Sequence, residues 1–273
     1  MHRTAQDTAR RVTPRRTETP VPPRSVLGRG LAVLAAFGDT VGRSELSLAE
    51  VVQATGLPSA TAHRLLAELV GWGAVERCAR GRYRVGIRLW HLGALAPVAR
   101  DLRDAALPPM QDLAAVTGDV VHLVVLDEQP EPTPRFRALF LERLAGHHDV
   151  RVRSSVGRRM PLHASGPGKV LLAHAPPRVR DAVLADGLPR LASGTITDPE
   201  ALLRALAEVR ATGSCLSHDE MTDGASSVAA PVHDPAGEVV ASLAVVVPST
   251  TALPPLVPAV RMAAAAASRR LLH

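Results

Sequence analysis

The sequence predicts an α+β protein with an N-terminal winged helix-turn-helix and a larger C-terminal domain in which helices flank an antiparallel sheet. Three observations lead to this expectation. The chain of 273 residues is longer than most single domains. Helical periodicity from residue 25 onwards gives way to a short hairpin pattern, and strand-sized apolar runs separated by turns follow in the second half.

The positive charge is concentrated near the N-terminus. Residues 1–24 carry six Arg against two acidic residues, residues 25–96 carry eight Arg against five, and the remainder is close to neutral. Residues 1–24 lack apolar periodicity and predict a disordered basic arm. A basic first third is typical of a nucleic-acid-binding module, although a solvated Arg-rich end explains the charge equally well.

Two helices are predicted before the first tight turn. The first covers SVLGRGLAVLAAFG, where five apolar side chains share one helical stripe: Val26, Leu27, Leu31, Leu34 and Phe37. The second begins in SLAEVVQATG, because Ser47 and Glu50 have the spacing of a capping box. Gly56 is expected to end it.

A third helix, capped near Ser59, follows the short TGLP connection and completes a helix-turn-helix. Its predicted inward face consists of Ala62, Leu65, Leu66 and Leu69. The next segment, AVERCARGRYRVG, predicts two short strands around residues 79–81 with arginines at the tip and on the return strand. This hairpin is a wing, and it closes a domain that we place at residues 25–86.

Residues 87–97 predict a linker helix, and residues 98–273 the C-terminal domain. The helical pattern is interrupted at Pro97 and again at Pro108 and Pro109. Strands are expected in VVHLVVLD, RFRALFLERL, DVRVR, SVAAPVHD and EVVASLAVVV, and helices in HASGPGKVLLAHA, near 178–186, near 198–212 and in the Ala-rich C-terminus. Because residues 234–237 predict a hairpin turn, the sheet is expected to be antiparallel.

The outward face of the third helix is the candidate DNA-reading surface. It carries Ser59, Ala60, Thr61, His63 and Arg64. In the major groove, hydroxyls and Arg meet phosphates and base edges, and Ala contacts thymine methyls. In the wing, the side chains that could reach phosphates or the minor groove are Arg80, Arg82 and Arg84. The alternatives are a winged fold used for protein contacts and wing arginines that are only solvated charges.

The stretch HASGPGKV contains Lys169, the only lysine of the chain. A phosphate-binding loop of the form G-x-x-x-x-G-K-[ST] would need Gly in place of His163 and a hydroxyl in place of Val170, so the nucleotide interpretation fails. What is left is a helix-entry loop at Ser165 and Gly166, whose free N–H groups favour an anionic group. An ordinary glycine-rich cap is the plainer interpretation.

Cysteine usage and hydropathy predict a reduced, cytoplasmic protein without a disulfide or a membrane span, because only Cys78 and Cys215 are present and no apolar run is long enough. No cofactor or metal is expected. His147, His148 and Asp149 cluster, but a surface turn explains them at least as well as a metal site.

Catalytic signatures such as G-x-S-x-G and H-E-x-x-H are missing, so no catalytic residue is expected. Two alternative functions are open: an enzyme acting on a small organic acid through Ser165, His163 or the cluster at residues 147–149, and a DNA-binding protein without an effector.

Four segments in this order resemble the IclR family of bacterial transcriptional regulators: SVLGRGLAVLAAF, LSLAEVVQATGLPSATAHRLLAELVGWGAVER, GRYRVGIRLWHLG and VGRRMPLHASGPGKVLLA. The resemblance extends from about Ser25 to the C-terminus. It implies a linker helix used in dimerisation and a C-terminal GAF/PAS-like domain that binds a small effector. It also implies a homodimer or tetramer that represses or activates transcription at a double-stranded DNA operator.

The resemblance also implies site residues. Arg29 joins the third helix and the wing as a DNA contact. The implied effector-facing positions are Val152, Ser165, Gly166, Pro167, Ser217, Ala225, Ser227, Ala244 and Val246. Ala244 and Val246 stand where family members that bind small keto acids have polar residues, so a partly apolar effector is expected. Pro167 removes one backbone N–H from the loop and stiffens it.

The expected mechanism is that effector occupancy changes the spacing of two winged domains through the linker near residues 89–97, which requires different effector affinities for the two arrangements.

Overall fold

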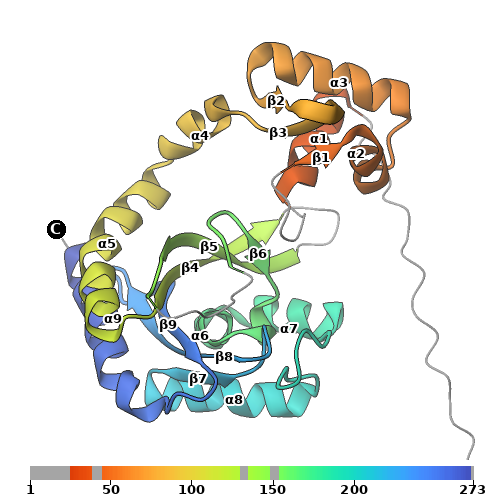
Figure 1. Cartoon of the computed structure of the whole chain (residues 1–273). Coiled ribbons are helices and arrows are strands. Elements are labelled where there is room, and N and C mark those ends of the chain that lie inside the picture. Colours follow the sequence, from red (N-terminus) through yellow and green to blue (C-terminus); the bar gives the residue numbers. More distant parts are fainter. Residues whose placement is uncertain (1–24, 39–44, 130–134, 148–153, 272–273) are drawn as a thin grey trace, which may run out of the picture. The chain divides into compact units, whose positions relative to one another are not determined.

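The computed structural model describes residues 25–38, 45–129, 135–147 and 154–271 (Figure 1). These residues form two compact units, and the main division between them falls between Val85 and Gly86. The predicted basic arm and the predicted strand DVRVR lie outside the described residues.

The N-terminal unit is a winged helix-turn-helix, as predicted. Its elements are α1 (Val26–Gly38), β1 (Leu46–Ser47), α2 (Leu48–Thr55), α3 (Ser59–Trp72), β2 (Val75–Arg77), the 3-10 turn η1 (Ala79–Gly81) and β3 (Arg82–Val85). The capping box of Ser47 and Glu50 is present, and Gly56 ends α2 with a left-handed φ of 66°. The strand order is β1-β3-β2, so β3 is the central strand of the wing sheet.

Two local expectations about this unit need correction. Ser59 does not cap α3: it is the first helical residue, and Pro58 precedes it without a side-chain hydrogen bond. On α1, only part of the predicted stripe packs inward. The side chains of Val26, Leu27 and Leu31 are exposed. Val33 and Ala36 are buried and Leu34 and Phe37 pack partly buried beside them, so the inward face of α1 lies in its C-terminal half.

The C-terminal unit is built on a six-stranded antiparallel sheet, which confirms the predicted fold class. Its helices and turns are α4 (Ile87–Ala94), α5 (Pro97–Thr117), η2 (Leu162–Ala164), α6 (Gly166–His174), α7 (Pro177–Asp186), α8 (Pro199–Thr212), η3 (Pro254–Leu256) and α9 (Val257–Leu271). Its strands are β4 (Val120–Gln129), β5 (Arg135–Leu144), β6 (Arg159–Met160), β7 (Cys215–His218), β8 (Ala225–His233) and β9 (Val239–Pro248), in the order β6-β5-β4-β9-β8-β7.

Of the two predicted interruptions of the helix in the linker region, the one at Pro97 is confirmed and the one at Pro108 and Pro109 is wrong. The chain breaks between α4 and α5, where Pro97 is the first residue of the new helix. Pro108 and Pro109, however, lie inside α5. The helix continues through them because it buries an unbroken apolar stripe, Leu102, Ala106, Met110 and Leu113, against the sheet and α9.

The two faces of the sheet are covered by different helices. One face packs against α5 and α9 and is lined by aliphatic side chains such as Leu123, Leu243 and Val245. The other face curls around α6, with α7 and α8 beyond it (Figure 1). The expected hairpin turn between β8 and β9 is present, and Gly237 adopts a φ of 85° there. The side chains around α6 form the second site described below.

Candidate functional site

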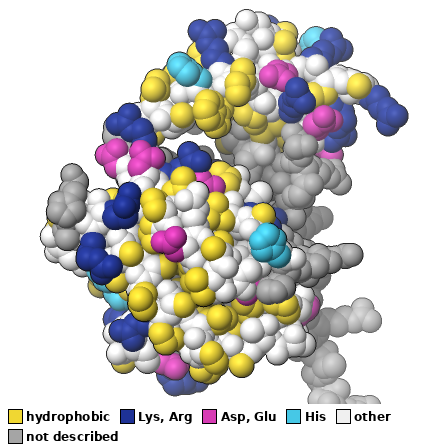
Figure 2. Space-filling model, turned by 60° about the vertical axis from the view of Figure 1, so that its left-hand side comes forward, with side chains coloured by type: hydrophobic (Ala, Val, Ile, Leu, Met, Phe, Trp, Pro, Cys, Tyr) yellow, Lys and Arg dark blue, Asp and Glu magenta, His cyan; other side chains and the backbone are white. Residues whose placement is uncertain are grey.

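The polar side chains predicted on α3 share one open face. Ser59, Ala60, His63 and Arg64 are exposed and Thr61 is half-buried, whereas Ala62, Leu65 and Leu66 face the core. Within the described residues, neither His63 nor Arg64 has a hydrogen bond or an ion pair. Their side chains are therefore available to an external partner. Figure 2 shows Arg and His side chains projecting from this unit, which is the upper part of the view.

The tip of the wing presents one arginine to solvent. Arg80 and Gly81 both adopt left-handed conformations, with φ of 58° and 70°, and this tight turn places Arg80 at the exposed end of the hairpin. In the described part of the chain Arg80 has no charged partner. Arg29, by contrast, is half-buried on α1.

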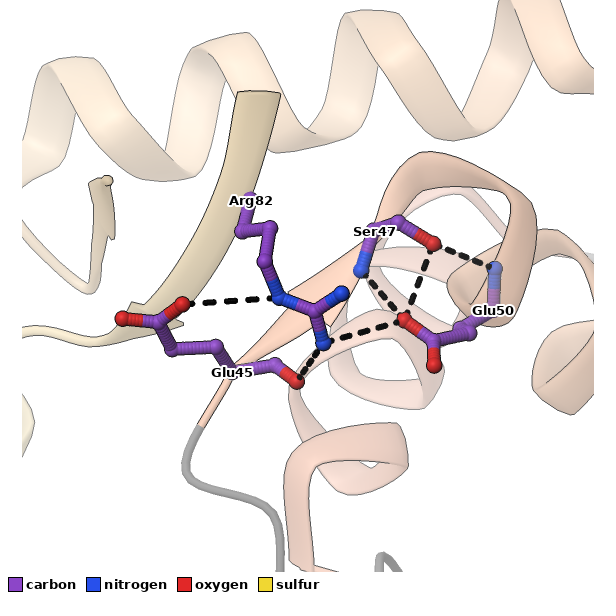
Figure 3. Close-up of polar contacts among 4 residues, drawn as sticks. All are labelled: Glu45, Ser47, Glu50 and Arg82. Carbon is purple, nitrogen blue, oxygen red and sulfur yellow. Dashed lines mark hydrogen bonds and ion pairs between the residues drawn. The ribbon is translucent and has the colours of Figure 1, made fainter. Parts of the chain in front are cut away.

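The other two wing arginines form ion pairs inside the unit, and Figure 3 shows those of Arg82. Arg82 lies 3.4 Å from the Glu45 carboxylate and 3.3 Å from that of Glu50, and it donates a hydrogen bond of 2.6 Å to the Glu45 carbonyl. Glu50 also accepts from the backbone N–H of Ser47 at 2.7 Å. Arg84 pairs with Glu76 at 2.7 Å. Arg82 therefore connects β3 to β1 and to the start of α2. Arg84 is likewise engaged within the unit, by Glu76.

A small cavity lies between α6 and the sheet of the C-terminal unit. Six of the residues implied as effector-facing line it: Ser165, Pro167, Ser217, Ala225, Ser227 and Val246. Sequence reasoning missed five others, namely His122, Phe140, Met221, Thr222 and Ser226. Gly166 adjoins the cavity, since a Cβ on it would lie 2.8 Å from the Ser227 Oγ. Ala244 is buried beneath it in the sheet, and Val152 lies outside the described residues.

The α6 end of the cavity is rich in hydroxyl groups. Ser165 is the N-cap of α6, and its Oγ accepts a hydrogen bond of 3.2 Å from the Gly168 N–H. Gly168 has no room for a side chain, because a Cβ there would lie 2.4 Å from the Leu162 carbonyl oxygen. Thr222 Oγ1 is buried and has no hydrogen-bond partner in the described residues. An unpaired buried hydroxyl favours a ligand with a polar atom.

Lys169 does not line the cavity. Its ammonium group is buried and forms an ion pair of 2.5 Å with the Glu220 carboxylate. The Glu220 carbonyl accepts a second bond, 2.6 Å long, from Thr195 Oγ1. Lys169 therefore holds the segment that carries Met221 and Thr222 against α6, and it is a structural residue rather than a phosphate ligand.

His122 of β4 is the ionisable group of the cavity wall. Its Nε2 lies 2.7 Å from Ser154 Oγ, and its ring meets Phe140 edge-on with centroids 5.0 Å apart. Burial, assisted by Arg143, lowers the pKa of His122 to about 3, so the ring is neutral near pH 7. The sequence signal was present, because VVHLVV places one polar residue in an otherwise apolar buried strand.

The groups proposed for catalysis do not come together. His163 is buried away from the cavity, and its Nε2 lies 3.1 Å from the Pro189 carbonyl oxygen. Cys215, which was not among these groups, is no better placed, because burial raises its pKa to about 11 and disfavours a nucleophilic thiolate. His147 is exposed, whereas His148 and Asp149 lie outside the described residues. The described segments contain no cluster of three or more His, Cys, Asp or Glu able to hold a metal.

Comparison with known proteins agrees with this two-unit organisation. The IclR helix-turn-helix domain matches residues 26–78, and the C-terminal domain of the bacterial transcriptional regulator IclR matches residues 96–269. The regulator BhcR of Paracoccus denitrificans is 34% identical over 221 residues, covering 80% of this chain and 76% of the relative. The glycerol operon regulatory protein of Streptomyces griseus is 34% identical over 237 residues, covering 84% and 90%.

Solved structures give the same result. An IclR homologue from Microbacterium hydrocarbonoxydans, crystallised with 4-hydroxybenzoate, is 38% identical with a TM-score of 0.79 and covers 90% of this chain and 99% of its own. A putative regulator from Rhodococcus sp. RHA1 is 29% identical with a TM-score of 0.71, covering 90% and 97%. No helix among the described residues is long and apolar enough to cross a membrane. The chain belongs to the IclR family of bacterial transcriptional regulators, which are ligand-responsive DNA-binding proteins and not enzymes.

Proposed function

We propose that this regulator responds to a small aromatic carboxylic acid bound in the cavity between α6 and the sheet. The observation that carries the proposal is the composition of the cavity wall, in which Phe140, Met221 and Val246 are apolar while hydroxyl groups gather near the α6 N-terminus. Hydroxyls and helix N–H groups favour a carboxylate, and the apolar wall favours a ring. The 4-hydroxybenzoate of the Microbacterium homologue has this chemistry.

The cavity must widen to take such a ligand. Its volume of about 30 Å³ suits roughly two water molecules. Met221 is half-buried in the wall, and its unbranched side chain can change rotamer at low cost. We expect Met221 to move first, whereas the segment around it stays attached to α6 through the Lys169–Glu220 pair.

For DNA binding we propose that α3 enters the major groove and that Arg80 reaches the backbone. Arg64 has an exposed side chain and no partner in the described residues, so it is the leading base contact. Ser59, Ala60, Thr61 and His63 are further contacts on the same face. Arg29, Arg82 and Arg84 also remain predicted contacts, but the ion pairs of the last two make them secondary.

The experiment is a gel shift of the full chain on the intergenic region upstream of its own gene, with and without 4-hydroxybenzoate. Arg64→Ala should weaken specific binding by roughly 1–3 kcal/mol and random-DNA binding by less. Arg204→Ala, an exposed arginine of α8 in the C-terminal unit, is the matched control. Equal losses of Arg64→Ala on both DNAs would restrict Arg64 to phosphate contact, and indifference to the acid would remove the proposed effector.

We also propose that the protein acts in the cytoplasm as a homodimer or tetramer. The support is α4, whose apolar side chains are largely exposed in a single chain: Ile87, Trp90, Leu92 and also Leu95 at its end. Such a surface is typical of an interface. Residues 87–97 serve as the proposed linker between the domains at 25–86 and 98–273. Light scattering of the full chain and of Trp90→Asp measures the assembly, and an unchanged mass would exclude this surface.

A further inference from the structure

The polar groups of the cavity stand at two separate places on the sheet. Ser217 of β7 and Ser227 of β8 pair with each other and face the N-terminus of α6. His122 lies on β4, which is separated from β8 by β9. Because neighbouring strands are about 4.8 Å apart, His122 lies roughly 10 Å from Ser227 and roughly 14 Å from Ser217 across the sheet, and Ser227 stands two residues along β8 from Ala229, the position level with His122. Between them the wall is apolar, with Val246 on β9.

This spacing fits a rigid ligand with a polar group at each end. In a para-substituted benzoate the ring separates the carboxylate from the second substituent, and hydrogen bonds extend the span at both ends by about 2.8 Å each. The carboxylate belongs at the serine end, because the Ser217 and Ser227 hydroxyls and the Gly166 N–H can donate hydrogen bonds to it, whereas Pro167 has no N–H and the Gly168 N–H already binds Ser165. The second substituent then reaches β4.

His122 is suited to an uncharged partner. Among the described residues that line the cavity, it is the one side chain that can ionise. Arg143 is its register partner on β5, and this positive charge disfavours protonation of the ring, as does burial. Ala244 on β9 and Ser154 add no charge. A neutral imidazole hydrogen-bonds well to a hydroxyl and compensates a carboxylate poorly.

We propose that His122 is the specificity-determining residue of the effector cavity and that it hydrogen-bonds the hydroxyl group at the far end of a para-hydroxylated aromatic acid. The inference rests on the proposed effector class. It adds that the carboxylate of the ligand binds at the serine end of the cavity and the hydroxyl group at β4. Ser154 Oγ bonds the Nε2 of His122 and Phe140 meets the ring edge-on, so the ring orientation is defined before the ligand enters and Nδ1 is the nitrogen left for the hydroxyl group.

The test is calorimetric titration of the full chain with 4-hydroxybenzoate, benzoate and 3-hydroxybenzoate. Wild type should bind 4-hydroxybenzoate at least tenfold more tightly than either other acid, because only the para hydroxyl reaches His122. His122→Phe should bring the ratio of the 4-hydroxybenzoate and benzoate affinities close to one while changing benzoate affinity little. His122→Gln, which keeps a hydrogen-bonding group, should retain part of the preference.

The outcomes separate the two proposals. If wild type binds none of the acids, the effector class is wrong and the role of His122 falls with it. If wild type binds benzoate and 4-hydroxybenzoate equally, the effector class stands and the role of His122 is refuted; this result needs no variant to fold. If Arg143→Gln abolishes binding of both acids while His122→Phe leaves their ratio unchanged, the carboxylate lies at the β4 end, which also refutes the assignment.

Discussion

Removing the ammonium group of Lys169 should destabilise the C-terminal unit far more than removing any surface charge. Lys169 and Glu220 have side chains only 3% and 7% exposed, and the Glu220 Oε2 has no hydrogen-bond partner within the described residues. Lys169→Met keeps most of the volume and leaves a buried carboxylate unpaired. Breaking such a pair on one side costs about 3–5 kcal/mol, since the remaining charge loses its partner without regaining water.

A double variant separates the charge from the packing. In Lys169→Met with Glu220→Gln the buried charge is absent, so most of the lost stability should return. The exposed pair of Arg204 and Glu200, 3.8 Å apart, is the matched control. Arg204→Ala should change the free energy of unfolding by less than about 0.5 kcal/mol.

The assay is native-state hydrogen exchange of the full chain, followed by mass spectrometry on peptides from β8 and β9, which reports on this unit alone. A loss of about 3 kcal/mol corresponds to a roughly 150-fold rise in the exchange rate of the most protected amides. If the protected amides of Lys169→Met exchange within tenfold of the wild-type rate, the Glu220 carboxylate is solvated or neutralised at little cost in the free energy of unfolding. The structural role assigned to the lone lysine would then be refuted.

Two further predictions concern the wing and the cavity. Arg80→Ala should reduce the dependence of DNA affinity on salt by about one counterion, whereas Arg82→Ala should change the salt slope less and should lower the melting temperature. Equal slopes for both variants would contradict this division. The pKa of His122 falls from 6.5 to about 3 on folding, so protons favour the unfolded state below pH 6.5. Lowering the pH to 5 should therefore cost about 2 kcal/mol of stability, measured by urea denaturation, and His122→Gln should lack this loss.

Local sequence signals predicted the elements that depend on local physics. The capping box of Ser47 and Glu50 satisfies its own helix end, and the turn at residues 234–237 has the residues that its backbone requires. The strands β4, β8 and β9 are long apolar runs. These features were predictable from neighbouring residues in the sequence, because the groups that stabilise them lie within a few residues of one another.

Features that depend on distant partners were missed. β1, β6 and β7 contain two to four residues each and exist only because a longer strand pairs with them. The ion pair of Arg82 with Glu50 joins residues 32 positions apart. The sequence therefore contains no sign that Arg82 has an internal partner, and all three wing arginines were predicted to contact DNA. Pro108 and Pro109 were predicted to interrupt the helix, because the loss of a backbone hydrogen bond at each proline is a local effect. The packing that outweighs this loss comes from α9 and the sheet, which are distant in the sequence.

The Lys169–Glu220 pair also bears on the walls of the proposed effector cavity. Lys169 belongs to the same helix as the hydroxyl-bearing Ser165, and Glu220 precedes Met221 and Thr222, so one buried bond joins two walls of the cavity. The opposite end is fixed separately, because Ser154 and Phe140 hold His122 on a central strand. A cavity can discriminate between ligands of different length only if rigid elements hold both of its ends. The lysine that resembled a phosphate ligand therefore holds the α6 loop and the segment with Met221 and Thr222 together as one end of the proposed effector cavity.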